Sequence, residues 1–365
     1  MAIERRDILR MIAAASVTPM FPFTARAAPG ELYAAALREP DGTFAVALFS
    51  PETGIVMKSA LPGRGHSCLR RPGRMQCVVF ARRPGTFAVA LDVNDRRAPV
   101  AFASSPGRHF YGHGAFSRDG RLLYTTENDY DDRRGVIGVR DVDAGYRLIG
   151  EFPSGGTGPH DIAMLPDGRT LVIANGGIET HPDFGRELLN LKTMAPSLVY
   201  IDAETGDLLE SHSLPGHMHQ LSIRHLAACA DRAVVFGCQH KGAKNVTPNL
   251  VGFHRRGEDL ELAEIPETAN GRLKGYVGSV AADASGEIVA VTSPRGGVAL
   301  YFDVSGRRFL RLTAFSDASG VAGRAGQRGF VLTSGSGRIA GTNGDGDQCL
   351  GAFDVAWDNH LTAIR

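Results

Sequence analysis

A histidine returns at nearly fixed spacing along this chain, each time just before a strand-like segment. His66 lies in GRGHSCLRRPGR, His113 in YGHGAFSRDGR and His160 in GPHDIAMLPDGR, and consecutive members are 47 residues apart. A repeat of this length, built from short strands and turns, is typical of one blade of a β-propeller, in which four-stranded sheets surround a central axis. Equivalent residues then form a ring around that axis. The sequence therefore predicts a ring of imidazole groups.

The rest of the chain aligns with this repeat to give seven blades. The segments HDIAML, TLVIANGG, SLVYIDAETG and DLLESHSLPG show the apolar–polar alternation and turn signals of four successive strands. The segment LYAAALREPDG fits the second strand of a blade whose first strand is missing, and His360-Leu361-Thr362-Ala363-Ile364 at the other end can supply it. We predict an all-β fold: a single seven-bladed β-propeller domain over residues 28–365, closed by the C-terminal strand, which completes the first blade.

The alignment assigns one residue per blade to the ring. The seven positions are His66, His113, His160, His219, Ser279, Gly320 and His360. The whole chain has 12 histidines in 365 residues, so five histidines at seven aligned positions argue against chance placement. His212, His225 and His254 have no equivalent position in the repeat, and we expect them to be structural or exposed.

The first 27 residues have the features of an export signal. Arg5-Arg6 is followed by Leu9 and Arg10, then by the apolar run MIAAASV and an Ala25-Arg26-Ala27 cleavage pattern. This resembles the twin-arginine signal, with an ordinary secretory signal as the alternative. The apolar run is far shorter than the ~20 residues that span a bilayer, so no stable membrane span is expected. We expect residues 1–27 to be removed and the protein to be periplasmic.

Propeller topology places the loops between second and third strands on the face where the ring histidines begin their strands. Seven polar or charged side chains of the chain fall in these loops or beside them: Arg82, Glu127, Asn175, His181, His240, Lys241 and Arg295. We expect them to surround the mouth of the channel, with the insertion 178–196 as a candidate lid. The formal net charge of +1 argues against a nucleic-acid partner.

Clustered neutral imidazoles are good ligands for copper, iron, nickel and zinc, and cationic groups beside them favour an anion. We therefore predict that the protein binds a transition metal, iron or copper, or an anionic metal complex. The predicted metal ligands are His66, His113, His160, His219 and His360, with Arg82, Lys241 and Arg295 neutralising an anionic part of the ligand.

Three alternatives remain open. The ring histidines can simply hydrogen-bond the backbone of a neighbouring blade. The propeller can serve as a protein-interaction scaffold of a periplasmic uptake system. A metal-dependent hydrolase of the lactonase type is a third reading, because Glu127, Asn128 and Asn175 offer the ligand types it needs. The sequence contains no GxSxG or HExxH motif, so an enzyme is the less favoured reading.

Longer strings carry a family resemblance. The blade PHDIAMLPDGRTLVIANGG…LVYIDAETG resembles the YVTN-type propeller repeat, and GRHFYGHGAFS, LLYTTEND, ANGGIETHPDFGR, LNLKTMAPSL and SPRGG resemble an uncharacterised family of twin-arginine-exported propellers, known only as a domain of unknown function. The resemblance covers essentially the whole mature chain. It implies a periplasmic location, an association with iron-acquisition proteins and a role in metal uptake or handling, but it carries over no activity.

Overall fold

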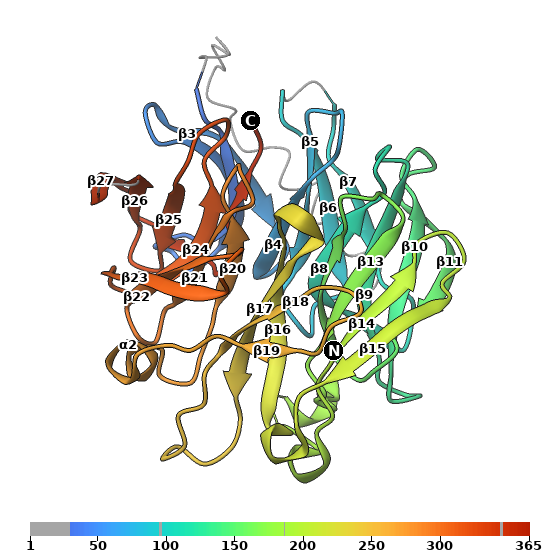
Figure 1. Cartoon of the computed structure of the whole chain (residues 1–365). Coiled ribbons are helices and arrows are strands. Elements are labelled where there is room, and N and C mark those ends of the chain that lie inside the picture. Colours follow the sequence, from blue (N-terminus) through green and yellow to red (C-terminus); the bar gives the residue numbers. More distant parts are fainter. Residues whose placement is uncertain (1–29, 95–96, 186, 344–345) are drawn as a thin grey trace.

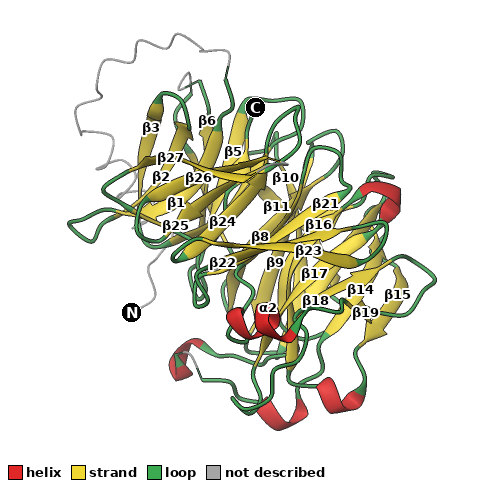
Figure 2. Ribbon diagram, turned by 60° about the vertical axis from the view of Figure 1, so that its left-hand side comes forward, coloured by secondary structure: helices red, strands yellow, loops and turns green. Residues whose placement is uncertain are grey.

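The structure is a computed structural model that describes residues 30–94, 97–185, 187–343 and 346–365, so the predicted signal, residues 1–27, lies outside the described residues. Seven sheets surround a central axis (Figure 1), which confirms the predicted seven-bladed propeller. Short helices lie in loops that connect the strands (Figure 2).

Six blades contain four consecutive strands each, with the first strand of each blade innermost. The strands are β4 (Gly65–Arg70), β5 (Gln76–Ala81), β6 (Phe87–Asp92), β7 (Val100–Ala103); β8 (Arg108–Phe116), β9 (Leu122–Asp129), β10 (Arg134–Asp141), β11 (Arg147–Pro153); β12 (Pro159–Met164), β13 (Thr170–Asn175), β14 (Ser197–Asp202), β15 (Leu208–Ser213); β16 (Leu221–Ala228), β17 (Val234–His240), β18 (Val251–His254), β19 (Glu261–Leu262); β20 (Ser279–Ala282), β21 (Ile288–Ser293), β22 (Val298–Asp303), β23 (Arg308–Ala314); and β24 (Ala318–Gly323), β25 (Phe330–Ser334), β26 (Arg338–Asn343), β27 (Gly346–Ala352).

The remaining blade joins the two ends of the described chain. It consists of β1 (Tyr33–Arg38), β2 (Phe44–Ser50) and β3 (Gly54–Leu61), with β28 (Ala356–Trp357) and β29 (Thr362–Ala363) both paired antiparallel to β1. The predicted closure by the C-terminal segment is therefore confirmed. Its innermost strand is interrupted, and His360 lies in the gap between β28 and β29.

Apolar runs explain why the middle strands of each blade are buried. All six residues of β13 and of β14 are buried, because Val, Ile, Leu and Tyr side chains on both faces pack against neighbouring blades. The outer strand β15 instead alternates exposed and partly buried residues, as expected for the solvent-facing edge.

The innermost strands are irregular where they face the axis. The pairing register skips His66 and Ser67 in β4, residues 111–113 in β8, His160 in β12 and Arg224 in β16. An unpaired residue of this kind is a β-bulge, which redirects a side chain relative to the regular pleat. The ring positions are therefore local departures from the strand ladder.

The short helices are η1 (Pro182–Phe184) and η2 (Leu191–Thr193) in the long insertion, η3 (Gly216–Met218), η4 (Ala230–Arg232) and α2 (Glu267–Arg272). Among the described residues, none of these helices has the length and apolar character needed to cross a membrane. Cys68 and Cys77 are buried free thiols on adjacent strands.

Candidate metal centre

Five histidine rings gather inside the channel, and we call His66, His113, His160, His225 and His360 the histidine cluster. The ring centroids of His113 lie 4.6 Å from those of His360 and 5.0 Å from those of both His66 and His160. His225 lies 4.9 Å from His160 and 5.0 Å from His360. Four inner strands contribute one ring each and the gap between β28 and β29 contributes the fifth, so side chains far apart in sequence converge on the axis.

The structure includes four of the five predicted ligands in this cluster and replaces the fifth. His219 precedes β16, ends the helix η3, and its Nδ1 atom lies 3.1 Å from the carbonyl oxygen of Gly216. His225, which we expected to be structural or exposed, is buried and contacts the rings of His113, His160 and His360. The repeat alignment placed the start of this blade's inner strand at His219. The bulge that redirects side chains toward the axis occurs later in the chain, at Arg224.

Two carboxylates orient two of the rings. The Nδ1 atom of His66 lies 3.2 Å from an oxygen of Asp358, and that of His113 lies 3.1 Å from an oxygen of Asp161. Burial alone would raise the pKa of Asp358, but His66 and the guanidinium groups of Arg82 and Arg64 hold it well below its usual range. Each Nδ1–H therefore donates to a carboxylate, which leaves Nε2 as the nitrogen available for a metal.

Three nitrogens of the cluster are buried without a hydrogen-bond partner: Nε2 of His113, Nδ1 of His225 and Nε2 of His360. The same three residues can place one ligand nitrogen each within 4.8 Å of one another. A buried polar atom without a partner is costly, and three such nitrogens close together are a set that one metal ion could satisfy. Ligand nitrogens of a tetrahedral zinc-like site lie roughly 3.3 Å apart, so a small closing movement of the rings would suit one ion.

His160 differs from the other rings of the cluster in its hydrogen bonding. Its Nδ1 atom lies 3.2 Å from Nη1 of Arg224, and because a guanidinium can only donate, that nitrogen must accept. The hydrogen of the neutral ring is then on Nε2. His66, His113 and His160 also form a group with metal-ligand spacing, but in this arrangement His160 has no free lone pair. The set of His113, His225 and His360 is therefore the better ligand set.

Burial keeps three rings of the cluster, those of His66, His225 and His360, unprotonated. It lowers the pKa of His66 to about 4, against the opposing effect of Asp358. Burial, followed by the neighbouring cationic forms of His66 and His113, holds the pKa of His360 and of His225 well below the usual value. Neutral imidazole is the form that binds a metal, so these rings are ready to act as ligands at neutral pH.

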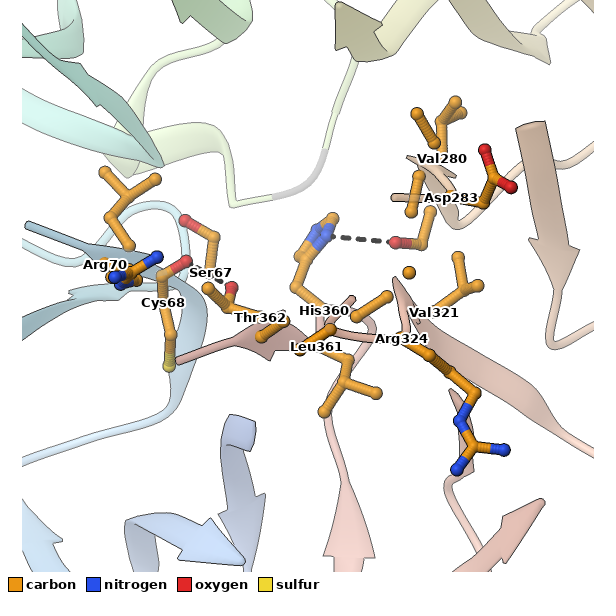
Figure 3. A pocket seen from close by; sticks show the side chains of 18 of the residues that line it. Ser67, Cys68, Arg70, Val280, Asp283, Val321, Arg324, His360, Leu361 and Thr362 are labelled. Carbon is orange, nitrogen blue, oxygen red and sulfur yellow. Dashed lines mark hydrogen bonds between the residues drawn. The ribbon is translucent and has the colours of Figure 1, made fainter. Parts of the chain in front are cut away.

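A cavity of about 580 Å³ leads to the cluster. His113, His225 and His360 line it together with the inner strands and the turns that follow them, such as Arg70 and Arg324. Nδ1 of His360 lies 3.5 Å from the hydroxyl oxygen of Ser279. Figure 3 shows His360 between Arg70 and Arg324, which lie on opposite sides of it. The opening thus lies on the face of the first-to-second-strand turns, opposite the face where we expected the mouth.

The seven polar residues predicted around the mouth do not line this cavity. Glu127 is fully buried inside a blade and pairs with Arg140 at 2.9 Å, and Asn175 donates to the carbonyl oxygen of Ser154 at 2.9 Å. Both are structural contacts within the sheets. Their polar side chains at strand ends looked like loop ligands because sequence does not show which groups they meet.

The other five remain near the opposite face. Arg82 lies 3.4 Å from Asp358, and the ring of His181 packs 5.0 Å from that of Tyr130. The remaining three make the following contacts: His240 to the carbonyl oxygen of Ala243 at 3.2 Å, Lys241 to Gln239 at 2.8 Å, and Arg295 to the ring of Tyr276 at 4.4 Å.

A second group with metal-ligand spacing, Glu210, His212 and His254, lies on the outer strands. His254 has both nitrogens engaged, with the hydroxyl of Tyr200 at 2.6 Å and the carbonyl oxygen of Glu258 at 2.9 Å. Because protein partners satisfy its nitrogens, this group lacks the free lone pairs of the central cluster.

Comparison with known proteins adds the family and the fold. The chain is similar in fold to the hydrazine synthase of Kuenenia stuttgartiensis, with a TM-score of 0.63 and 14% identity over 90% of this chain and 100% of that one. No curated protein matches the sequence. A family model described as protein of unknown function (DUF1513) matches residues 59–364. The chain therefore belongs to this family of proteins of unknown function.

Proposed function

We propose that this protein binds one transition-metal ion in the channel, with His113, His225 and His360 as ligands. The observation that carries the proposal is the convergence of three buried imidazole nitrogens that have no other partner. Asp161 would hold His113 in the tautomer that presents Nε2, as outer carboxylates do in many metal sites. His66 lies beside this set, with its ring centroid 4.4 Å from that of His360, and would be an additional ligand.

The donor set favours copper over iron. All three ligands are neutral nitrogens, whereas the nearest carboxylates, Asp161 and Asp358, are engaged with Nδ1 atoms of the rings. Imidazole-only sites suit copper, zinc or iron, and among divalent ions copper binds most strongly to such donors. The proposal also covers an ion that arrives as an anionic complex, because cationic side chains lie beside the cluster.

We further propose that this site acts in metal uptake or handling in the periplasm, in keeping with the predicted export signal. The lactonase-type alternative loses its support, because Glu127 and Asn175 are committed to contacts within the blades.

Metal content tests the proposal. The chain is purified without an affinity tag, incubated separately with Cu²⁺, Fe²⁺ and Zn²⁺, freed of excess ion and measured by elemental mass spectrometry. We expect about one copper per chain, a loss of at least tenfold in His225→Gln and His360→Gln, and full retention in His219→Gln, which changes a predicted ligand outside the cluster.

Two results would overturn it: no ion retained by the unchanged protein, or equal loss in His219→Gln and His225→Gln. Circular dichroism and thermal unfolding of each variant separate loss of the site from loss of the fold. Loading with iron but not copper would refute the preference for copper while leaving the site in place.

A further inference from the structure

Three cationic side chains lie on the face opposite the cavity without an acidic partner. Arg224 is on β16, Lys241 directly follows β17, and Arg295 lies in the turn between β21 and β22. Within the part of the chain that the structure describes, no carboxylate oxygen lies within ion-pair distance of their side-chain nitrogens. Their surroundings therefore carry an excess of positive charge.

A chain of contacts connects them. Gln239 on β17 pairs with Ser222, two residues before Arg224, and accepts a hydrogen bond from Nζ of Lys241 at 2.8 Å. Gln239 also forms a backbone bridge with Tyr276, whose ring is covered by the guanidinium of Arg295 at 4.4 Å. The three cations are thus linked through Gln239 and Tyr276 across two neighbouring blades.

The pKa of Lys241 also reflects its positively charged surroundings. Burial, followed by the charges of Arg224, Arg295 and Arg83, lowers the pKa of Lys241 to about 6. The charged form of Lys241 is therefore destabilised by its burial and by its cationic neighbours, which is the condition that a bound anion would relieve.

Two buried hydrogen-bond donors without a partner also favour a bound anion. Arg224 is only 8% exposed, and its Nε atom is buried without a partner. The hydroxyl of Tyr111 is likewise buried without a partner. A ligand that only accepts hydrogen bonds and carries negative charge would satisfy both the donors and the charge.

We propose that Arg224, Lys241 and Arg295 form an oxyanion site that takes a carboxylate or phosphate group. The site is built from other residues than the metal site and lies on the other side of His160. Arg224 is the contact between the two, since its Nη1 atom donates to His160.

Calorimetric titration of the metal-free full chain with inorganic phosphate, and separately with succinate, tests the proposal. We expect one of the two to bind, with a dissociation constant raised at least tenfold by Lys241→Gln and by Arg224→Gln. Lys244→Gln is the matched control, because Lys244 is an exposed lysine of the same loop and the substitution removes the same charge. The anion that binds identifies the ligand as a phosphate or a carboxylate.

Proton uptake gives a second readout. The charged groups that act on Lys241 are Arg224, Arg295 and Arg83, and its contacting group Gln239 is neutral. At pH 7.5 most of its amine is unprotonated, so an anion should bind together with a proton, detected as a heat that depends on the buffer. Lys241→Gln should abolish this dependence.

The variants distinguish failure of the oxyanion proposal from failure of the metal proposal. Lys241→Gln should keep its copper, and His225→Gln should keep its anion. If neither phosphate nor succinate binds, or if Lys244→Gln weakens binding as much as Lys241→Gln, the oxyanion site is refuted whatever the metal content.

Discussion

Acid should destabilise the metal-free protein well above the pH at which carboxylates titrate. His66 is 4% exposed, and burial lowers its pKa from 6.5 to about 4. The unfolded chain takes up a proton as the pH falls through 6.5, whereas the folded chain does not until pH 4. Stability is therefore fully present above pH 6.5 and is lost as the pH falls toward 4.

The magnitude follows from the width of this window. Each pH unit between the two pKa values corresponds to about 1.4 kcal/mol, so a decrease from pH 7 to pH 5 removes about 2 kcal/mol through His66 alone. His225 and His360 act in the same direction, because burial also lowers their pKa values. Lys241 does too, since its pKa of about 6 in the folded state is below the usual value.

Urea unfolding at pH 7 and pH 5, with a chelator present, measures the loss. His66→Gln isolates one contribution: its stability should fall by about 2 kcal/mol less than that of the unchanged protein over this range. His219→Gln should show the same pH dependence as the unchanged protein. A free energy of unfolding that is equal at pH 7 and pH 5 would refute the conclusion that the cluster is buried in its neutral form.

Two other substitutions and one truncation test the fold against the site. Glu127→Gln should destabilise the protein by about 3–5 kcal/mol, because it leaves the buried guanidinium of Arg140 without its partner, yet copper content should not change. Gly65→Ala should cost about 1–3 kcal/mol in urea unfolding, since a Cβ atom there would lie 2.7 Å from that of Ala36. Removal of residues 361–365 should lower the thermal midpoint markedly, because it deletes β29 and exposes an edge of β1.

Sequence periodicity was sufficient for the architecture because a propeller repeats one supersecondary unit. Turn signals and alternating apolar residues located the strands, and the missing first strand of the first blade predicted the closure that β28 and β29 provide. Spacing alone was not sufficient for the site. The long insertion 178–196 shifts the next repeat to higher residue numbers, so the alignment selected His219, which precedes the inner strand. The residue of that strand whose ring faces the axis is His225.

The sequence pattern also could not predict which groups each side chain contacts. Glu127 and Asn175 stand at strand ends that looked like loops, but neighbouring strands supply Arg140 and Ser154 to them. Asp161 directly follows a ring histidine, yet it orients a different one, His113, from the adjacent blade. A signal was present for Arg224-His225, since two ionisable residues within an otherwise apolar inner strand require a reason to be buried.

The position of Arg224 makes the two proposed sites interdependent. By donating to Nδ1 of His160, it keeps that ring from offering this nitrogen to a metal and leaves the ligand set to His113, His225 and His360. An anion that draws the guanidinium away would release Nδ1 of His160 and change the donors available beside the ion. Thermodynamic linkage then requires that the metal change the affinity for the anion by the same factor. Equal anion affinities with and without copper would show that Arg224 holds both contacts at once.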